Sequence, residues 1–393
     1  MTPLPFIRWF FLFSSLCLAS GCFSYRDLIP GRTELTRKSV VVPAQVVGSH
    51  FVVETKWDRQ GPWRFLVDTG SSVTLVTPEF ADRYATRSAA VSTPPVLVRA
   101  SSGEAGLLPG GTVRRIDLGD AHFENVQVLV KDLGEISAHL GIKIDGILGF
   151  PLFRNAVLTL DYPNQRLVLT SPLRAEPSLG FTIRFNDARR IPLIPVTIGS
   201  VNVVALIDSG SDAPLILNPT GLSPVYAAEP RPGSVVETLI GSRSEEIGRL
   251  GESLRIGPYE FTEPLIDLTD ELTSIGGEIL KHFAVTFDQS RNQVTFHRED
   301  PAPIRMPPRR STGLAFSKGP TYWRVVTVVP GSPADQLGIE VGDLVTRING
   351  ESISAWPFAR LEPYVRRNNE VVFTFIDGSR EKPVVVPTFD LVP

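Results

Sequence analysis

Residues 65–72 read FLVDTGSS, and an altered copy of the same motif, ALIDSGSD, returns at residues 205–212. Each copy is an apolar run that ends in an aspartate, Asp68 or Asp208, followed by a hydroxyl residue and a glycine. Two carboxylates a few ångströms apart cannot both ionise easily, so such a pair tends to hold one proton between them. The ionised member can then take a proton from water while the protonated member donates to a substrate carbonyl. We therefore take Asp68 and Asp208 as candidate catalytic residues.

The residues after each aspartate suit a sharp turn that supports the carboxylate. Gly70 and Gly210 permit close backbone approach because glycine has no side chain. The hydroxyls of Thr69 and Ser209 can hydrogen-bond across to the other copy of the motif and so fix the position of one turn relative to the other. We expect all four residues to support the candidate catalytic turns.

A second hydroxyl follows each glycine, at Ser71 and Ser211. There it can donate to the outer oxygen of the neighbouring carboxylate, which favours the charged form and lowers the pKa of that group. The alternative is that these serines only stabilise the turn.

The rest of the chain repeats in the same order. DGILGFPLF, which contains Gly149, is answered by SIGGEIL, which contains Gly276, and Gly119 aligns with Gly257 between these landmarks. AVLTLDYPNQRLVL and FAVTFDQSRNQVTF then follow, each with a polar turn between two apolar runs. Ordered matches of this kind indicate one β-rich unit used twice. The alternative, two aspartates that merely end strands in tight turns, does not explain the second glycine landmark.

These motifs resemble those of the aspartic proteases, both the pepsin-like enzymes and the retropepsins. In that family each lobe supplies one D-[ST]-G loop, backed by an apolar-apolar-Gly element. The matching elements here are Ile147-Leu148-Gly149 and Ser274-Ile275-Gly276. The resemblance implies a mainly β fold, with two retropepsin-like β-barrel lobes that form a bilobal aspartic-type endopeptidase. It also implies hydrolysis by water activated between two carboxylates, without a covalent intermediate, metal or cofactor.

The resemblance points to substrate-binding residues as well. Asp212 looks like the extra acid of retropepsins that contacts the substrate backbone. Residues 98–113, VRASSGEAGLLPGGTV, occupy the flap position, and Gly103 and Gly106 suit a mobile hairpin that admits substrate. The alternative there is an ordinary surface loop. The matching stretch of the second unit, residues 238–253, is charged, and we expect a non-functional flap.

Composition limits the remaining possibilities. A chain of 393 residues suits two to four domains, and short β-branched runs between many Gly and Pro indicate mostly β structure. The net charge is −3 and charges of both signs are interspersed, so the sequence shows no basic patch of the kind that binds nucleic acid. The histidines have no ligand spacing, and the two cysteines, Cys17 and Cys22, precede the expected folded body. A zinc site or a cysteine nucleophile in that body is therefore excluded.

The start of the chain reads as an export signal. A weakly positive start is followed by an apolar stretch too short for a comfortable membrane span, and LCLASGC resembles the lipobox of bacterial lipoproteins. We expect a signal peptide at 1–21, lipidation at Cys22 and a tether at 22–40; the alternative is a plain signal peptide with an incidental cysteine. Residue 23 is Phe and not the Asp of the inner-membrane retention signal, so in an organism with two membranes we expect outer-membrane placement facing the periplasm.

The end of the chain changes character. We assign residues 301–312, rich in Pro and Arg, to an extended linker. Residues 313–393 resemble a bacterial PDZ domain, a small α+β fold, because a GSPA helix start, a Gly-Asp pair and an Ile-Asn-Gly turn follow in order. In that family a GLGF-type loop points backbone N–H groups at a peptide's C-terminal carboxylate. The loop here consists of Gly313, Leu314, Ala315 and Phe316.

The sequence thus predicts an exported, lipid-anchored aspartic endopeptidase with a first lobe at 41–173, a second at 174–300 and a PDZ domain. The expected partners are a polypeptide substrate, a peptide C-terminus at the PDZ domain and a membrane, with no nucleic acid. Because the chain carries both D-[ST]-G loops, we expect a monomer. The competing hypothesis is a catalytically inactive peptide-binding or scaffold lipoprotein of the cell envelope.

Overall fold

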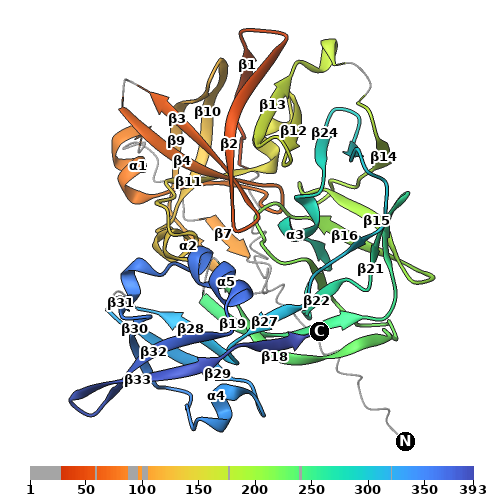
Figure 1. Cartoon of the computed structure of the whole chain (residues 1–393). Coiled ribbons are helices and arrows are strands. Elements are labelled where there is room, and N and C mark those ends of the chain that lie inside the picture. The colour runs from red at the N-terminus through yellow and green to blue at the C-terminus, as the bar shows by residue number, and fades with distance from the viewer. Residues whose placement is uncertain are drawn as a thin grey trace, which may run out of the picture.

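A computed structural model describes residues 28–57, 60–86, 96–99, 105–175, 178–238, 241–319 and 321–393 (Figure 1). Strands dominate it, as the sequence predicts. Two of the candidate site residues, Cys22 and Gly103, lie outside the described residues. Within the described ranges no helix is long and apolar enough to cross a membrane.

The first lobe runs from residue 28 to residue 175. Its elements are β1 (Arg32–Leu35), β2 (Ser39–Val47), β3 (His50–Trp57), β4 (Gln60–Asp68), β5 (Thr74–Val76), α1 (Pro78–Tyr84), β6 (Ala85–Thr86), β7 (Val96–Arg99), β8 (Ala105–Leu108), β9 (Gly110–Leu118), β10 (Ala121–Val130), α2 (Gly134–Leu140), β11 (Gly146–Gly149), the 3-10 turn η1 (Phe150–Phe153), β12 (Val157–Asp161), β13 (Arg166–Thr170) and η2 (Pro172–Arg174).

The second lobe follows from residue 178 to residue 305. Its elements are β14 (Phe181–Arg184), β15 (Leu193–Ile198), β16 (Val201–Ile207), β17 (Leu215–Leu217), β18 (Tyr226–Thr238), β19 (Gly241–Leu250), β20 (Leu254–Ile256), β21 (Tyr259–Thr262), β22 (Leu265–Leu268), β23 (Ser274–Ile275), α3 (Gly277–Leu280), β24 (Ala284–Asp288), β25 (Gln293–His297) and β26 (Ile304–Arg305).

The two lobes use the same strand order. Hydrogen-bonded neighbours run β3–β4–β11–β5–β10–β9 in the first lobe and β15–β16–β23–β17–β22–β19 in the second. In both, a short apolar strand, β11 or β23, lies parallel to the strand that leads to the aspartate and antiparallel to the strand after the turn. Every residue of these two central strands is buried, as expected of strands covered on both faces.

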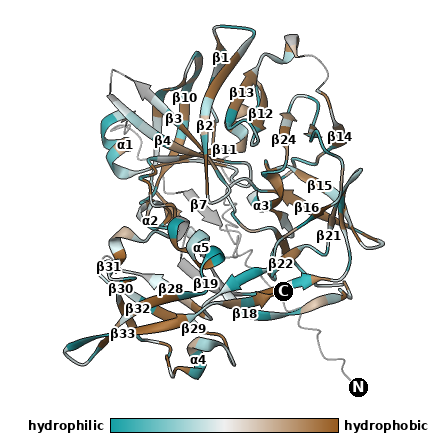
Figure 2. Cartoon of the chain, in the orientation of Figure 1, coloured by the Kyte–Doolittle hydropathy of each residue, from teal (hydrophilic) through white to brown (hydrophobic). Residues whose placement is uncertain are grey.

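A shared antiparallel sheet joins the lobes. Its strands run β2–β13–β12–β24–β25–β14, three from each lobe, and β12 pairs directly with β24. The apolar side chains of both lobes merge into one core, in which the rings of Phe150 and Phe287 lie 5.3 Å apart. Figure 2 shows that the strands carry most of the hydrophobic colour. The lobes are therefore halves of one packed body.

The C-terminal domain lies on the side of the lobes away from β12 and β24 (Figure 1). Its elements are β27 (Arg309–Ser311), β28 (Leu314–Lys318), β29 (Trp323–Val328), α4 (Pro333–Gln336), β30 (Leu344–Ile348), β31 (Glu351–Ser352), η3 (Ile353–Ala355), α5 (Phe358–Arg367), β32 (Glu370–Asp377), β33 (Arg380–Pro387) and β34 (Phe389–Val392).

This domain packs on both lobes. Helix α5 contacts α2 of the first lobe, and β28 and β29 lie beside β18 of the second. A Cβ on Gly141 would lie 2.4 Å from Pro357, which shows how closely the α2 end approaches the start of α5. Leu391 and Val392 of β34 belong to the same core cluster as the lobes.

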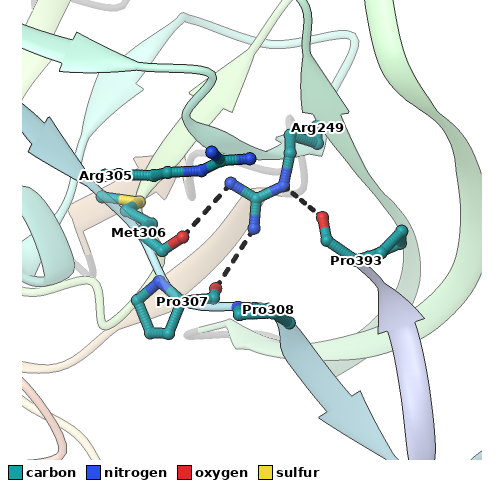
Figure 3. A pocket seen from close by; sticks show the side chains of 6 residues that line it. All are labelled: Arg249, Arg305, Met306, Pro307, Pro308 and Pro393. Carbon is teal, nitrogen blue, oxygen red and sulfur yellow. Dashed lines mark hydrogen bonds between the residues drawn. The ribbon is translucent and has the colours of Figure 1, made fainter.

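Arg249 in β19 connects the second lobe to the end of the chain (Figure 3). The residue is only 2% exposed. Its guanidinium donates to the carbonyl oxygens of Glu263 at 2.7 Å, Met306 at 3.3 Å, Pro307 at 3.2 Å and Pro393 at 2.6 Å. It lines a depression of about 330 Å³. One buried cation thus holds three separate segments together through their carbonyl groups.

Two expected boundaries are wrong. Strand β1 lies inside the expected tether, residues 22–40, yet it pairs with β10, so the first lobe begins before residue 41. Strands β26 and β27 lie at the expected linker, residues 301–312, yet they pair with β21 and β34. Strands β1, β26 and β27 place their backbone N–H and C=O groups in sheets, so the described parts of these two segments are not free.

Candidate active site

The structure places Asp68 and Asp208 at equivalent turns. Asp68 ends β4 and pairs with Gly149 of β11, while Asp208 directly follows β16 and its N–H donates to the carbonyl of Ile275 at 2.9 Å. The glycine landmarks found in the sequence therefore back the two aspartate turns in the same way.

The glycines of these landmarks have a steric reason. A Cβ on Gly149 would lie 2.2 Å from the carbonyl oxygen of Val73, and a Cβ on Gly276 would lie 2.2 Å from that of Ala213. No side chain fits at such distances, so each glycine lets the turn pack directly on the central strand. Ser274 at the start of the second element does not change this arrangement.

The hydroxyls of Thr69 and Ser209 cross between the lobes, as expected. Thr69 Oγ1 donates to the carbonyl of Ile207 at 2.6 Å and accepts the N–H of Ser209 at 3.0 Å. Ser209 Oγ donates to the carbonyl of Val67 at 2.7 Å and accepts the N–H of Thr69 at 3.0 Å. Both residues are fully buried, so these four bonds fix the relative height of the two turns without competition from water.

The turns also bring the carboxylates together. A Cβ on Gly70 would lie 2.5 Å from Asp208 Oδ1, and a Cβ on Gly210 would lie 2.4 Å from Asp68 Cγ. Each glycine thus leaves room for the carboxylate of the opposite lobe. The two carboxyl groups therefore lie close enough for each to affect the pKa of the other.

Burial raises the pKa of both carboxyl groups, and the negative charge of Asp208 raises the pKa of Asp68 further. Backbone N–H groups oppose this effect: those of Gly70 and Ser71 donate to Asp68 Oδ1 at 2.8 and 3.0 Å, and that of Gly210 donates to Asp208 Oδ1 at 2.9 Å. Two adjacent carboxyl groups with raised pKa values are suited to share one proton, the state that can act as base and acid at once.

The expected role of Ser71 is wrong. Its hydroxyl donates to the carbonyl of Val73 at 2.8 Å, so that proton is not available to the Asp68 carboxylate; the backbone N–H of Ser71 bonds to the carboxylate instead. The hydroxyl of Ser211 accepts the N–H of Ala213 at 3.2 Å. Ser71 therefore acts as a turn residue through its side chain and as a carboxylate donor through its backbone.

Asp212 lies beside the second turn and pairs with a histidine from the first lobe. Its Oδ2 is 2.8 Å from Nε2 of His139 in α2. Burial disfavours the Asp212 anion, but the hydrogen bond and charge of His139 outweigh burial and hold the pKa of Asp212 well below its usual range. Contact of Asp212 with a substrate stays a prediction.

Sequence reasoning missed two histidines near the turns. His139 contacts Asp212, and the ring of His50 lies 6.2 Å from that of His139. Spacing gave no sign of this cluster, because its members come from β3, α2 and the second turn. Tyr162 was also missed; its buried hydroxyl has no hydrogen-bond partner among the described residues, and burial together with the charges of Asp208 and Asp68 raises its pKa.

The expected flap contains a hairpin. Strands β7 and β8 pair, with Val98 opposite Gly106. The corresponding strands of the second lobe, β18 and β19, form a longer hairpin that lies against β28 and β29 of the C-terminal domain. The second hairpin therefore has a structural partner that its charged sequence did not indicate.

The loop expected to bind a peptide carboxylate opens β28. The N–H of Gly313 bonds to Ser311 Oγ at 2.9 Å, and Leu314, Ala315 and Phe316 pair with β29. The side chains of Leu314, Ala315 and Phe316 are buried. The expected short helix after Gly331 and the turn at Asn349 are both present, as α4 and the β30–β31 hairpin.

Comparison with protein families agrees with this geometry in two regions. An aspartyl protease family model matches residues 53–152, which include Asp68 and Gly149. A PDZ domain family model matches residues 324–376. No curated protein matches the chain. The chain therefore contains an aspartyl protease domain and, after it, a PDZ domain.

Proposed function

We propose that the chain is an aspartic endopeptidase whose two lobes each supply one catalytic carboxylate, Asp68 and Asp208. One observation carries the proposal: the two carboxyl groups lie close together over turns that Thr69 and Ser209 lock together across the lobes. A water between the carboxylates would lose a proton to the ionised member and attack the peptide carbonyl. The other member would protonate the carbonyl oxygen, giving a tetrahedral diol. The first member would then pass its proton to the amide nitrogen as the C–N bond breaks, and a diol hydroxyl would return a proton to the other member.

Incubation of the unmutated protein with a peptide library, followed by mass spectrometry, tests this function. We expect internal cleavage that is lost in Asp68→Asn and in Asp208→Asn. Asp120→Asn is the matched control, because Asp120 is an exposed carboxylate paired with Arg37 at 3.0 Å. Peptide binding without cleavage by the unmutated protein would favour the competing scaffold function.

The proposal includes activity as a monomer, since one chain carries both turns. Specific activity should stay constant on dilution. A fall in activity that follows dissociation of a dimer would contradict it.

The proposal also places the protein at the bacterial cell envelope through a lipid on Cys22. Lipid chains contribute about 0.8 kcal/mol per buried CH₂, so a diacylglyceryl group favours membrane attachment. Cys22→Ser should release the protein from membranes or leave its precursor uncleaved, while Cys17→Ser should change neither. Unchanged processing and fractionation of Cys22→Ser would point to a plain signal peptide or another anchor.

A further inference from the structure

His50 begins β3 and reaches from the first lobe to the second catalytic turn. The residue is 6% exposed, so its ring nitrogens depend on protein partners. Nδ1 lies 3.2 Å from the carbonyl oxygen of Gly48, and Nε2 lies 3.1 Å from that of Gly210. Gly210 belongs to the turn whose N–H holds Asp208 Oδ1.

The two partners define the form of the ring that fits. Carbonyl oxygens only accept hydrogen bonds, and a neutral imidazole has one N–H. In the neutral ring one nitrogen lone pair would face a carbonyl oxygen, whereas the imidazolium satisfies both contacts. The geometry therefore favours a positive charge at His50, next to the second turn.

The second lobe has no such residue at the equivalent place. Val52 pairs with Leu66 and Leu193 pairs with Leu206, in each case two residues before the aspartate. Two residues before Val52 stands His50, and two before Leu193 stands Ile191, which has no ring nitrogen. The first lobe thus has a basic side chain at this position, and the second lobe has an apolar one.

Titratable groups on several elements lie near this ring or its chain neighbours. They are Asp208 and Asp212 near the second turn, His139 on α2, Tyr162 beside Phe51, Glu278 on α3, to which Ser49 Oγ donates, and Lys281, which follows α3 and pairs with Glu278. The positive charge of His50 lowers the pKa of Asp208 and of Asp212, against the effect of burial.

We propose that His50 is a positioning residue of the dyad: its imidazolium holds the Gly210 carbonyl and stabilises the singly ionised carboxylate pair. This inference rests on the proposed peptidase function. The first lobe would then influence the ionisation of a carboxylate pair to which both lobes contribute.

Two substitutions separate the contact from the charge. His50→Gln retains an N–H near the position of Nε2 but carries no charge. We expect its kcat/KM maximum to remain within about threefold of the unmutated value, with both pH limits moved upward by about half a unit or more, because loss of a nearby cation disfavours carboxylate ionisation. His50→Asn reaches only toward Gly48, so its maximum should also fall about tenfold.

His122→Gln is the control, since His122 pairs with Asp117 on the β9–β10 hairpin. An unmoved or acid-shifted profile in His50→Gln would overturn the charge role, and equal maxima in His50→Gln and His50→Asn would overturn the contact role.

A measurement that needs no cleavage distinguishes failure of this inference from failure of the proposed function. In ¹⁵N spectra of the full chain, recorded under the conditions of the peptide assay, both ring nitrogens of His50 should carry a proton, as the two carbonyl contacts require. A neutral ring with one unprotonated nitrogen would overturn the inference, even if no peptide is ever cut.

Discussion

The hydroxyl groups of Thr159 and Thr286 lie 2.9 Å apart at the centre of the β12–β24 pair, where each residue faces its own counterpart in the repeat. Val157 pairs with Asp288 and Asp161 with Ala284, so the pairing is unchanged when the lobes are exchanged. A local twofold axis therefore passes between the two threonines. The same symmetry relates the two aspartate turns.

The crossed hydroxyls should contribute strongly to stability. Thr69→Val leaves the carbonyl of Ile207 and the N–H of Ser209 buried without partners, so we expect a loss of about 2–5 kcal/mol in the free energy of unfolding. Thr69→Ser, which retains the hydroxyl, should recover most of that loss. Urea denaturation measures the effect, and Thr197→Val, which removes an exposed hydroxyl bonded to Asn202, should change it by less than about 0.5 kcal/mol. A Thr69→Val loss no larger than this control would contradict the prediction.

Asp68→Asn should stabilise the protein at neutral pH although it abolishes the proposed activity. The folded pKa of Asp68 is raised, so the native state binds its proton more tightly than the unfolded state, whose pKa is about 3.9. The unmutated protein therefore loses stability as pH rises from about 3.9 through the folded pKa, at about 1.4 kcal/mol per unit of difference. Asparagine does not titrate and escapes this loss.

Thermal unfolding across pH checks this sign. The stability advantage of Asp68→Asn should be near zero in acid and reach a constant value above the folded pKa. An advantage for Asp68→Asn that shrinks with rising pH would refute the raised pKa.

Gly70→Ala should separate the carboxylates. The added Cβ would lie 2.5 Å from Asp208 Oδ1, so the opposite carboxylate must move, and we expect kcat/KM to fall at least about 100-fold. Gly210→Ala should behave alike, because its Cβ would lie 2.4 Å from Asp68 Cγ. Gly134→Ala, where the Cβ meets only the flexible end of Asp132 at 3.2 Å, should retain activity. Full activity of either turn variant would show that the carboxylates tolerate displacement.

Arg249→Lys should loosen the C-terminal domain. A lysine ammonium cannot spread its donors over the carbonyls of Glu263, Met306, Pro307 and Pro393 as the planar guanidinium does. We expect Arg249→Lys to lower the free energy of unfolding by about 2–4 kcal/mol.

Hydrogen exchange locates the effect of this change. Amides of β27 and β34 should exchange faster in Arg249→Lys, while those of β12 keep their protection. Arg255→Lys, which alters one exposed contact with Gly199, should leave all three strands unchanged. Uniformly faster exchange in Arg249→Lys would indicate global destabilisation instead of a local hold.

The sequence was informative where a residue type has one steric or chemical reason to be present. Asp68, Thr69 and Gly149 could be assigned from the motifs because the turn admits few alternatives. The pairing of β1 with β10 could not be predicted, since the two strands are distant in the chain and the polar residues of β1 do not show the pattern of a strand. Ser71 was misjudged because its hydroxyl has a carbonyl two residues away as a competing acceptor.

The β18–β19 hairpin occupies the place in the chain that a second flap would take, yet it lies against β28 and β29. Near its end, Arg249 donates a hydrogen bond to the carbonyl oxygen of Pro393. In a symmetric dimer of one-lobe chains, both flaps have the same sequence, so a mutation that changes the role of one flap changes the other as well. A fused chain is free of that constraint. The two copies therefore differ in their partners: β7 and β8 form a separate two-stranded hairpin, while β18 and β19 contact the C-terminal domain.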